Sequence, residues 1–209
     1  MKRIAAQDIL DAIDGTAYLA DRSGIIMAVG RPAWEAFAEE TAADVSDSDA
    51  VVGRSLFDMF RGDPVKDAYR ELHESAWLRG KRMISFEYRC DSPAVERHMR
   101  MSISAIRCGS ETVAVLYQSQ TLHQRSRIPM MMFEQEKWIR EGMKYEDSQI
   151  LGMCSYCHDV TWPVGAHAEN KTWISPEEYY RRLGPSDVVI SHGICPSCYE
   201  RVVRSNKAA

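Results

Sequence analysis

The chain has 209 residues, of which 45% are hydrophobic and 27% charged, and its formal net charge is −4. These values are those of ordinary globular proteins, so collagen-like, low-complexity and disordered classes are excluded. Six cysteines in a chain of this length are too few for a small disulfide scaffold, and one large domain or two modest ones remain.

The sequence predicts no membrane-spanning helix, because such a helix needs about 20 nearly uncharged apolar residues and no run here approaches that. Asp8 also interrupts the N-terminal segment before the apolar core of a signal peptide could form. We therefore expect a cytoplasmic protein, in which cysteines serve packing, metal binding or chemistry rather than disulfides.

The first elements predicted along the chain are a short amphipathic helix and a β-hairpin. Isoleucine and leucine recur at roughly helical spacing from Ile4 to Ile13, and this pattern ends before Gly15. Two apolar runs, Thr16–Ala20 and Ile25–Val29, then flank the sequence Asp-Arg-Ser-Gly, whose residue types favour a tight turn.

Helices are predicted next, followed by three strands. Residues 33–40 and 63–79 show helical apolar spacing, and Pro64 suits the first turn of the longer helix. Residues 51–60 are expected to form a short helical turn at most. Asp-Ser-Pro and Gly-Ser turns separate three β-rich runs, which span residues 82–89, 97–107 and 112–119.

In this order of elements, residues 5–122 resemble a PAS domain. The resemblance rests on the Asp-Arg-Ser-Gly hairpin, the Val-Gly-Arg-Ser-Leu-Phe-Asp segment, the helix ending in Arg-Gly-Lys and the three-strand meander. It implies a five-stranded antiparallel sheet with helices over one face, a small cavity for a cofactor or metabolite, and a homodimer. The chain departs from the family at Ser119, Gln120 and Thr121, where PAS domains commonly carry the Asp-x-Thr that couples them to an effector.

Residues 123–150 form a connecting segment that is rich in methionine and charge. After Pro129, apolar residues among Glu, Lys and Arg predict a helix from about Met130 to Asp147. This helix either packs on a neighbouring module or forms a dimer seam, although its apolar positions keep no heptad repeat. The predicted division of the chain is therefore 1–122, 123–150 and 151–209.

Two Cys-x-x-Cys pairs carry the strongest chemical signal in the sequence. Cys154 and Cys157 form the first pair, Cys195 and Cys198 the second, and 37 residues lie between them. Two residues between cysteines allow a tight turn to place both sulfurs on one ion, and two such turns complete a closed tetrahedral site of the structural zinc type. The predicted fold class is thus α+β: a PAS-like domain, a linker helix and a small four-cysteine zinc module.

The long segment between the two pairs is expected to contain a helix of its own. Ser175 suits its N-cap and Pro176 its first position, and the helix is predicted to end near Arg182. A module of this size has little core, and a bound ion offsets that deficit.

The same module carries a second resemblance. The similarity rests on Ser-His-Gly-Ile-Cys-Pro-x-Cys at residues 191–198, and on Met-Cys-Ser-Tyr-Cys at 153–157, Trp173 and Tyr179 before it. In these residues the module is similar to the C-terminal cysteine-rich module of many bacterial PAS sensor and response-regulator proteins. The resemblance covers about residues 151–203 and implies a sensory context and a metal-type fold rather than a reaction.

Three histidines are further site candidates. His192 is expected to orient a ligand by a hydrogen bond or to act as an alternative ligand, and His158, which is expected to be exposed, is the other alternative. Cys154-x-x-Cys157-His158 also matches covalent haem attachment, which would leave the second cysteine pair unused. His73, on the long predicted helix, is either a contact for a PAS ligand, with haem among the candidates, or an ordinary core or surface histidine.

The sequence contains no Walker loop, dinucleotide glycine fingerprint, nucleophile elbow or H-E-x-x-H string, so no enzyme activity is expected. We hypothesise a non-catalytic signal-sensing or adaptor protein with an unknown PAS ligand, structural zinc, a protein partner and no membrane contact.

Two alternatives remain beside this hypothesis: a transcription regulator that binds DNA through the zinc module, and a haem-based gas or redox sensor. DNA binding is disfavoured because residues 121–209 contain 11 basic and 11 acidic side chains, without the positive excess that phosphate binding requires.

Overall fold

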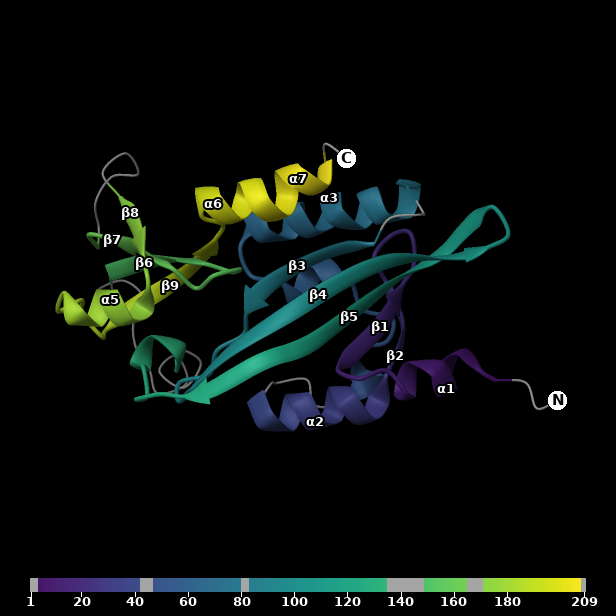
Figure 1. The fold of residues 1–209 in the computed structure, drawn as a ribbon, viewed down its shortest axis with the longest axis horizontal. Helices are drawn as coiled ribbons and strands as arrows, with labels where there is room; N and C mark the ends of the chain where they lie inside the picture. Colours follow the sequence, from purple (N-terminus) through teal and green to yellow (C-terminus); the bar gives the residue numbers. More distant parts are fainter. Residues whose placement is uncertain (1–3, 42–46, 80–82, 135–148, 165–170, 208–209) are drawn as a thin grey trace.

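The computed structural model describes residues 4–41, 47–79, 83–134, 149–164 and 171–207. An N-terminal domain, residues 4–126, is followed by a short 3-10 helix, η3 (Met131–Phe133), and a cysteine module, residues 149–207. In Figure 1 the cysteine module lies at one end of the molecule and the N-terminus at the other. No described helix is long and apolar enough to cross a membrane.

A five-stranded antiparallel sheet with the order β2-β1-β5-β4-β3 forms the centre of the N-terminal domain. The first and last strands in sequence pair directly, from Thr16 opposite Ser119 to Ala20 opposite Val115. The five strands are β1 (Thr16–Ala20), β2 (Ile26–Val29), β3 (Ile84–Arg89), β4 (Val95–Cys108) and β5 (Glu111–Ser126). The structure confirms the α+β fold class with a five-stranded antiparallel sheet.

Three α-helices and two 3-10 helices accompany this sheet. They are α1 (Ala6–Asp11), α2 (Arg31–Thr41), η1 (Ser48–Ala50), η2 (Leu56–Met59) and α3 (Asp63–Arg79). The predicted apolar face of α3 is confirmed, because one stripe of its side chains is buried. That stripe comprises Val65, Ala68, Tyr69, Leu72 and Ala76.

The cysteine module contains a second, four-stranded sheet with the order β8-β7-β6-β9, in which β6 and β9 run parallel. Its strands are β6 (Gln149–Cys154), β7 (Val160–Trp162), β8 (Thr172–Ile174) and β9 (Val188–Gly193). Its helices are α5 (Pro176–Arg181), α6 (Pro196–Cys198), the π-helix η6 (Tyr199–Arg204) and α7 (Ser205–Lys207). As predicted, α5 begins with Ser175 as N-cap, whose Oγ accepts a hydrogen bond from the Glu178 N–H at 3.1 Å.

One hydrophobic core extends through both parts of the molecule. Tyr156, between Cys154 and Cys157, is 1% exposed and packs its ring 5.4 Å from that of Phe86 and 6.2 Å from that of Tyr69. Its carbonyl accepts a hydrogen bond from the Arg89 N–H at 2.7 Å, which links the module to β3.

The C-terminal helical segment extends this shared core along α3. Figure 1 shows α3 and the α6–α7 segment side by side. Val202 and Val203 are buried in the same core as the N-terminal sheet, and Ser75 Oγ donates to the Asn206 carbonyl at 3.3 Å. The module is therefore packed against the N-terminal domain rather than tethered to it.

The largest difference from the predicted elements lies at the end of β5. This strand continues to Ser126, well past the predicted end at residue 119, because β4 continues to pair with it as far as Val95 opposite Ser126. The first part of the predicted linker helix is η3 instead of an α-helix, and the rest of that prediction, residues 135–148, lies outside the described residues.

Truncating Tyr156 tests the shared core. Tyr156→Ala removes a fully buried aromatic ring and is expected to lower the free energy of unfolding by about 3 to 5 kcal/mol. Tyr156→Phe is the matched control: the Tyr156 hydroxyl is buried without a hydrogen-bond partner in the described structure, so its removal should change stability by less than about 1 kcal/mol. Urea unfolding of the full chain, followed by circular dichroism and tryptophan fluorescence, measures both effects. If Tyr156→Ala leaves the unfolding of the N-terminal domain unchanged, the two parts of the molecule do not share a core.

Candidate metal centre

Parallel pairing of β6 with β9 brings the two Cys-x-x-Cys turns together. Cys154 is the last residue of β6, and the register places it opposite Gly193, two residues before Cys195. Each strand then runs into a tight turn: the Cys157 turn connects β6 to β7, and Cys198 ends the short helix α6. Two turns at the same end of neighbouring parallel strands necessarily face each other.

The four sulfur atoms of this cluster all lie within 4.8 Å of one another. Cys157 Sγ is 3.7 Å from Cys195 Sγ. A tetrahedral zinc site with Zn–S bonds of about 2.3 Å requires sulfur separations of about 3.8 Å, so the observed spacing fits such an ion. Cys154, Cys195 and Cys198 are buried, Cys157 is half-buried, and all four are free thiols.

Hydrogen-bond donors surround the sulfurs and favour negative charge on them. The Cys195 N–H donates to Cys154 Sγ at 3.3 Å, and the Cys198 N–H donates to Cys195 Sγ at 3.4 Å. Arg201 Nη2 lies 3.4 Å from Cys198 Sγ and donates to it.

These contacts give the thiols of the cluster unequal acidities. Hydrogen bonds from the Cys157 and Cys198 side chains and the Cys195 N–H lower the pKa of the Cys154 thiol far below its usual value. Donating to Cys154 in turn raises the pKa of Cys157. Four ionised thiolates this close together need a cation between them, and a thiophilic divalent ion supplies that charge.

Neither His158 nor His192 contributes an atom to this cluster of possible ligands, which consists of the four cysteine sulfurs. His192 lies on β9 opposite Met153. Its carbonyl oxygen approaches Gly62 so closely that a Cβ atom added to Gly62 would lie 2.3 Å from that oxygen. The described part of the chain has no hydrogen bond from the His192 side chain to a cysteine sulfur. Burial, Arg61 and His158 lower the pKa of His192, which favours its neutral form.

The expectation that His158 is exposed was wrong, because its side chain is only 14% exposed. The residue has a positive φ of 60° directly after Cys157, and this turn directs the imidazole toward the N-terminal domain. There Nδ1 lies 3.5 Å from Asp91 Oδ2, and the ring lies 5.5 Å from that of Phe133.

Asp91 is the centre of an ion-pair cluster that no local sequence pattern predicted. Its side chain is fully buried, Arg89 pairs with it, and Arg127 Nη1 approaches its Oδ2 to 2.8 Å. Although burial opposes ionisation, contacts with His158 and Arg89 hold the pKa of Asp91 well below its usual value. The Asp-Ser-Pro sequence had indicated only a turn, and the partners of Asp91 come from β3, the end of β5 and the cysteine module.

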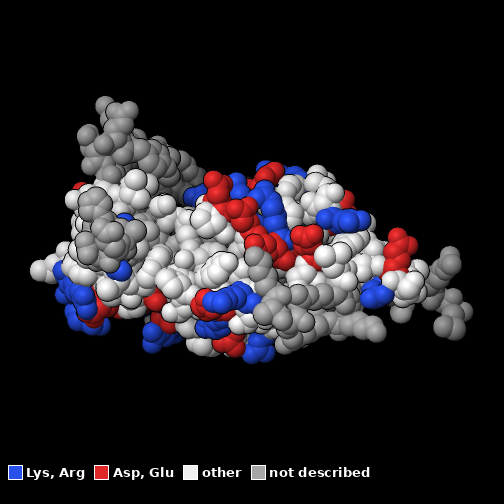
Figure 2. Space-filling view, turned by 90° about the horizontal axis from the view of Figure 1, so that it is seen from above, with Lys and Arg blue, Asp and Glu red and all other residues white. Residues whose placement is uncertain are grey.

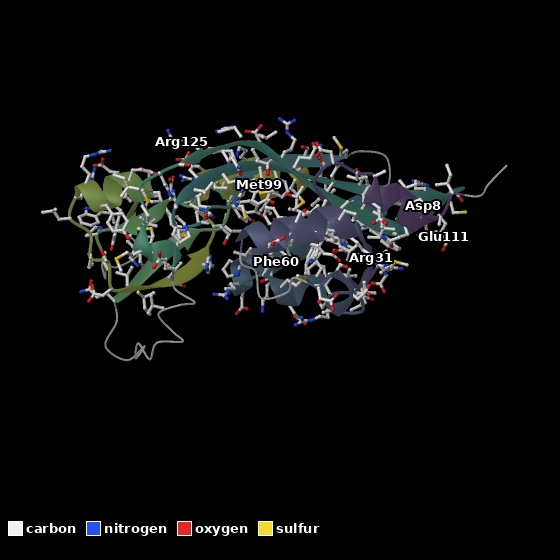
Figure 3. All side chains as sticks on the ribbon, turned by 90° about the horizontal axis from the view of Figure 1, so that it is seen from below. Asp8, Arg31, Phe60, Met99, Glu111 and Arg125 are labelled. Atoms are coloured by element: carbon white, nitrogen blue, oxygen red, sulfur yellow. The ribbon has the colours of Figure 1, made fainter. Side chains whose placement is uncertain are left out.

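Two further carboxylates extend this cluster at the edge of the module. Glu177 Oε1, on α5, lies 3.8 Å from Arg89 and 3.7 Å from Arg127. Glu96 Oε2 lies 3.7 Å from Arg89 and 2.6 Å from Arg125, which Figure 3 shows at the outer surface above the sheet. The cluster therefore joins strands of the N-terminal domain to the cysteine module where the two parts of the molecule meet.

His73 lies apart from the cysteines, in the core of the N-terminal domain. It is 3% exposed, and its Nδ1 is 2.9 Å from the hydroxyl oxygen of Tyr117 on β5. Burial lowers the pKa of His73, so the neutral imidazole is favoured. The structure thus places this candidate beside the N-terminal sheet.

No protein-family model and no curated protein match the chain. Several of the solved structures that it resembles are PAS domains. The PAS domain of BvgS from Bordetella pertussis has a TM-score of 0.44 at 10% identity, over 66% of this chain and 95% of that one. The PAS domain of nitrogen regulation protein NR(II) from Vibrio parahaemolyticus has a TM-score of 0.39 at 14% identity, over 57% of this chain and 100% of that one.

A sensory box sensor histidine kinase from Vibrio cholerae has the same TM-score, 0.39, at 10% identity, over 55% of this chain and 86% of that one. Values this low support no inference about ligand, signal or partner. The strand order itself and the covering helices make residues 4–126 a PAS-like domain, and this name is used below.

Removing the buried charge at residue 91 tests the ion-pair cluster. Asp91→Asn leaves Arg89 and Arg127 without their buried partner and is expected to destabilise the chain by about 3 kcal/mol or more at pH 7. The control Asp67→Asn breaks an exposed pair with Arg70 and should cost less than about 1 kcal/mol.

The pH dependence of the same variant has a defined sign. Because the pKa of folded Asp91 is depressed, its contribution is complete above the unfolded value near 4 and is lost as the pH falls below it. Urea unfolding between pH 3 and pH 7 should therefore show the difference between wild type and Asp91→Asn shrinking toward low pH. A difference that grows in acid would contradict this electrostatic role.

Proposed function

We propose that the chain is a non-catalytic signal-sensing or adaptor protein. In this proposal the PAS-like domain binds a small ligand, and the cysteine module holds one structural zinc ion and presents a surface to a protein partner. The observation that carries the proposal is the convergence of four cysteine sulfurs within 4.8 Å, in a core shared with a PAS-like domain.

Zinc is the ion that this donor set favours, because soft thiolates in tetrahedral arrangement select zinc or iron–sulfur centres. Four protein ligands leave no open coordination position for water or substrate, so the ion would supply folding energy rather than catalysis. Arg201 and the N–H donors at the sulfurs would disperse the negative charge of the thiolates.

The partner surface proposed here is formed by α3 together with the α6–α7 segment. These elements belong to different parts of the chain but lie side by side, so a protein that binds across them would contact both the PAS-like domain and the zinc module. Tyr199, at the start of η6, is 43% exposed and supplies the kind of aromatic side chain that protein interfaces use. A homodimer remains a prediction.

The two alternative functions gain no support from the geometry. Figure 2 shows acidic and basic side chains mixed on the face that it displays, whereas DNA binding needs a continuous basic surface. The pocket beside His73 has a volume of about 220 Å³, which is small for a porphyrin.

Metal analysis of the purified full chain tests the zinc centre. One zinc ion per chain is expected, and Cys195→Ser should lose the ion and unfold at lower temperature, because the site and the PAS-like domain share a core. Cys108→Ser is the matched control: this cysteine is exposed at the end of β4, so zinc content and melting temperature should stay at the wild-type values. Zinc near zero in the wild-type protein, even after reconstitution under reducing conditions, would refute the proposal.

A further inference from the structure

An open pocket of about 450 Å³, here called the seam pocket, lies between α3 and the segment that follows β9. Pro64 and Ala68 of α3 line one side, and Ile194, Pro196 and Tyr199 line the other. Ala68 is buried and Ile194 packs against the shared core, so the floor of the pocket is apolar and held in place by both parts of the molecule.

Acidic side chains line the seam pocket, and basic ones do not. Asp67 and Glu71 of α3 and Glu200 of η6 belong to its lining, whereas none of the described residues that line it is Lys, Arg or His. The side chains of Asp67 and Glu200 are 67% and 56% exposed, so these two carboxylates lie at the rim. The pocket therefore combines an apolar floor with negative charge at its edge.

Each rim carboxylate pairs with an arginine of its own helix, and both arginines lie outside the pocket lining. Asp67 Oδ1 is 2.8 Å from Nη1 of Arg70, whose Cζ also lies 5.4 Å from the centroid of the Phe57 ring. Glu200 Oε1 is 2.8 Å from Arg204 Nη1, and this pair is exposed as well. Exposed pairs contribute little to stability, and a carboxylate has lone pairs for further donors, so both groups can accept a second cation.

The second cysteine pair sets the position of the aromatic side of the pocket. Tyr199 directly follows Cys198, and its N–H donates to the Cys195 carbonyl at 2.9 Å. Tyr199 stays exposed, although Val202 and Val203 of the same helix are buried. The face of an aromatic ring attracts ammonium and guanidinium groups, so Tyr199 and the rim carboxylates favour the same kind of ligand.

We propose that the seam pocket binds a basic segment of a protein partner, with a Lys or Arg side chain of that partner between Asp67, Glu200 and the ring of Tyr199. The apolar stem of this side chain packs on Ala68 and Ile194. The negative rim favours such a segment over an acidic or purely apolar one. Sites for small molecules bury most of the ligand surface, whereas the rim of this pocket is exposed, so the observations favour a protein segment over a free metabolite. This inference rests on the proposed partner surface of α3 and the α6–α7 segment, and it specifies the chemistry of the partner.

Titration of the full chain with two synthetic peptides tests the assignment. One peptide repeats the sequence Leu-Lys-Ser, and the other has glutamate in place of each lysine. Fluorescence anisotropy of the labelled peptides should show one saturable site for the basic peptide and about tenfold or weaker binding of the acidic one. Added salt should weaken the binding of the basic peptide, because the rim carboxylates are exposed to solvent.

Charge-matched variants locate the site. Asp67→Asn together with Glu200→Gln should weaken binding of the basic peptide about fivefold or more, because two charge-assisted contacts are lost. The control, Asp49→Asn together with Glu87→Gln, removes the same charge and also breaks two exposed ion pairs, but outside the seam pocket, so it should bind as wild type does. Tyr199→Ala should weaken binding as well, whereas Tyr199→Phe keeps the ring and should retain it.

Equal affinity for the two peptides, or an equal loss in the two double variants, would overturn the assignment, because general electrostatic attraction would then explain the binding. Binding of acetyl-lysine amide as tight as that of the basic peptide would also overturn it, in favour of a small-molecule site. Zinc content of the same samples separates the two proposals. A folded chain that holds zinc but does not bind the basic peptide refutes the seam-pocket assignment alone, and a chain without zinc that still binds it refutes the zinc centre alone.

Discussion

The burial of Tyr156 is the interaction on which the rest of the structure depends. The residue stands between Cys154 and Cys157, so the turn that positions these two sulfurs also places an aromatic ring against Tyr69 and Phe86. The same few residues therefore form the cysteine turn and pack on the PAS-like domain. Metal binding and the docking of the module are for this reason expected to be one cooperative event rather than two.

Local sequence patterns predicted the parts of the fold that depend on neighbouring residues. The spacing within each cysteine pair, the Ser175 cap of α5 and the apolar stripe of α3 are all properties of short segments, and the structure has each of them. The β5 strand was predicted too short for a related reason. Its last residues, from Thr121 to Ser126, are exposed and, apart from Leu122, polar, and their pairing with β4 makes them a strand.

The features that sequence reasoning missed depend on contacts between distant residues. Asp91 looked like a turn residue, yet Arg127, far along the chain, pairs with its carboxylate, and His158 from the other part of the molecule lies beside it. His158 was expected to be exposed, yet Asp91 and Phe133, both distant from it in sequence, lie beside its ring. Neither error could be corrected from periodicity or spacing, since both depend on how the module sits on the sheet.

The helix α3 contacts both the pocket beside His73 and the C-terminal helices of the cysteine module. Its His73 and Arg70 line the pocket, whereas Ser75, from the same stretch of helix, contacts Asn206 next to the buried valines of η6. A ligand that bound this pocket would stabilise α3 through mass action, and α3 also packs against the C-terminal helices of the cysteine module. The pocket and the cysteine cluster therefore share one packed element, so a ligand that favoured one arrangement of α3 would alter the surface of the C-terminal helices.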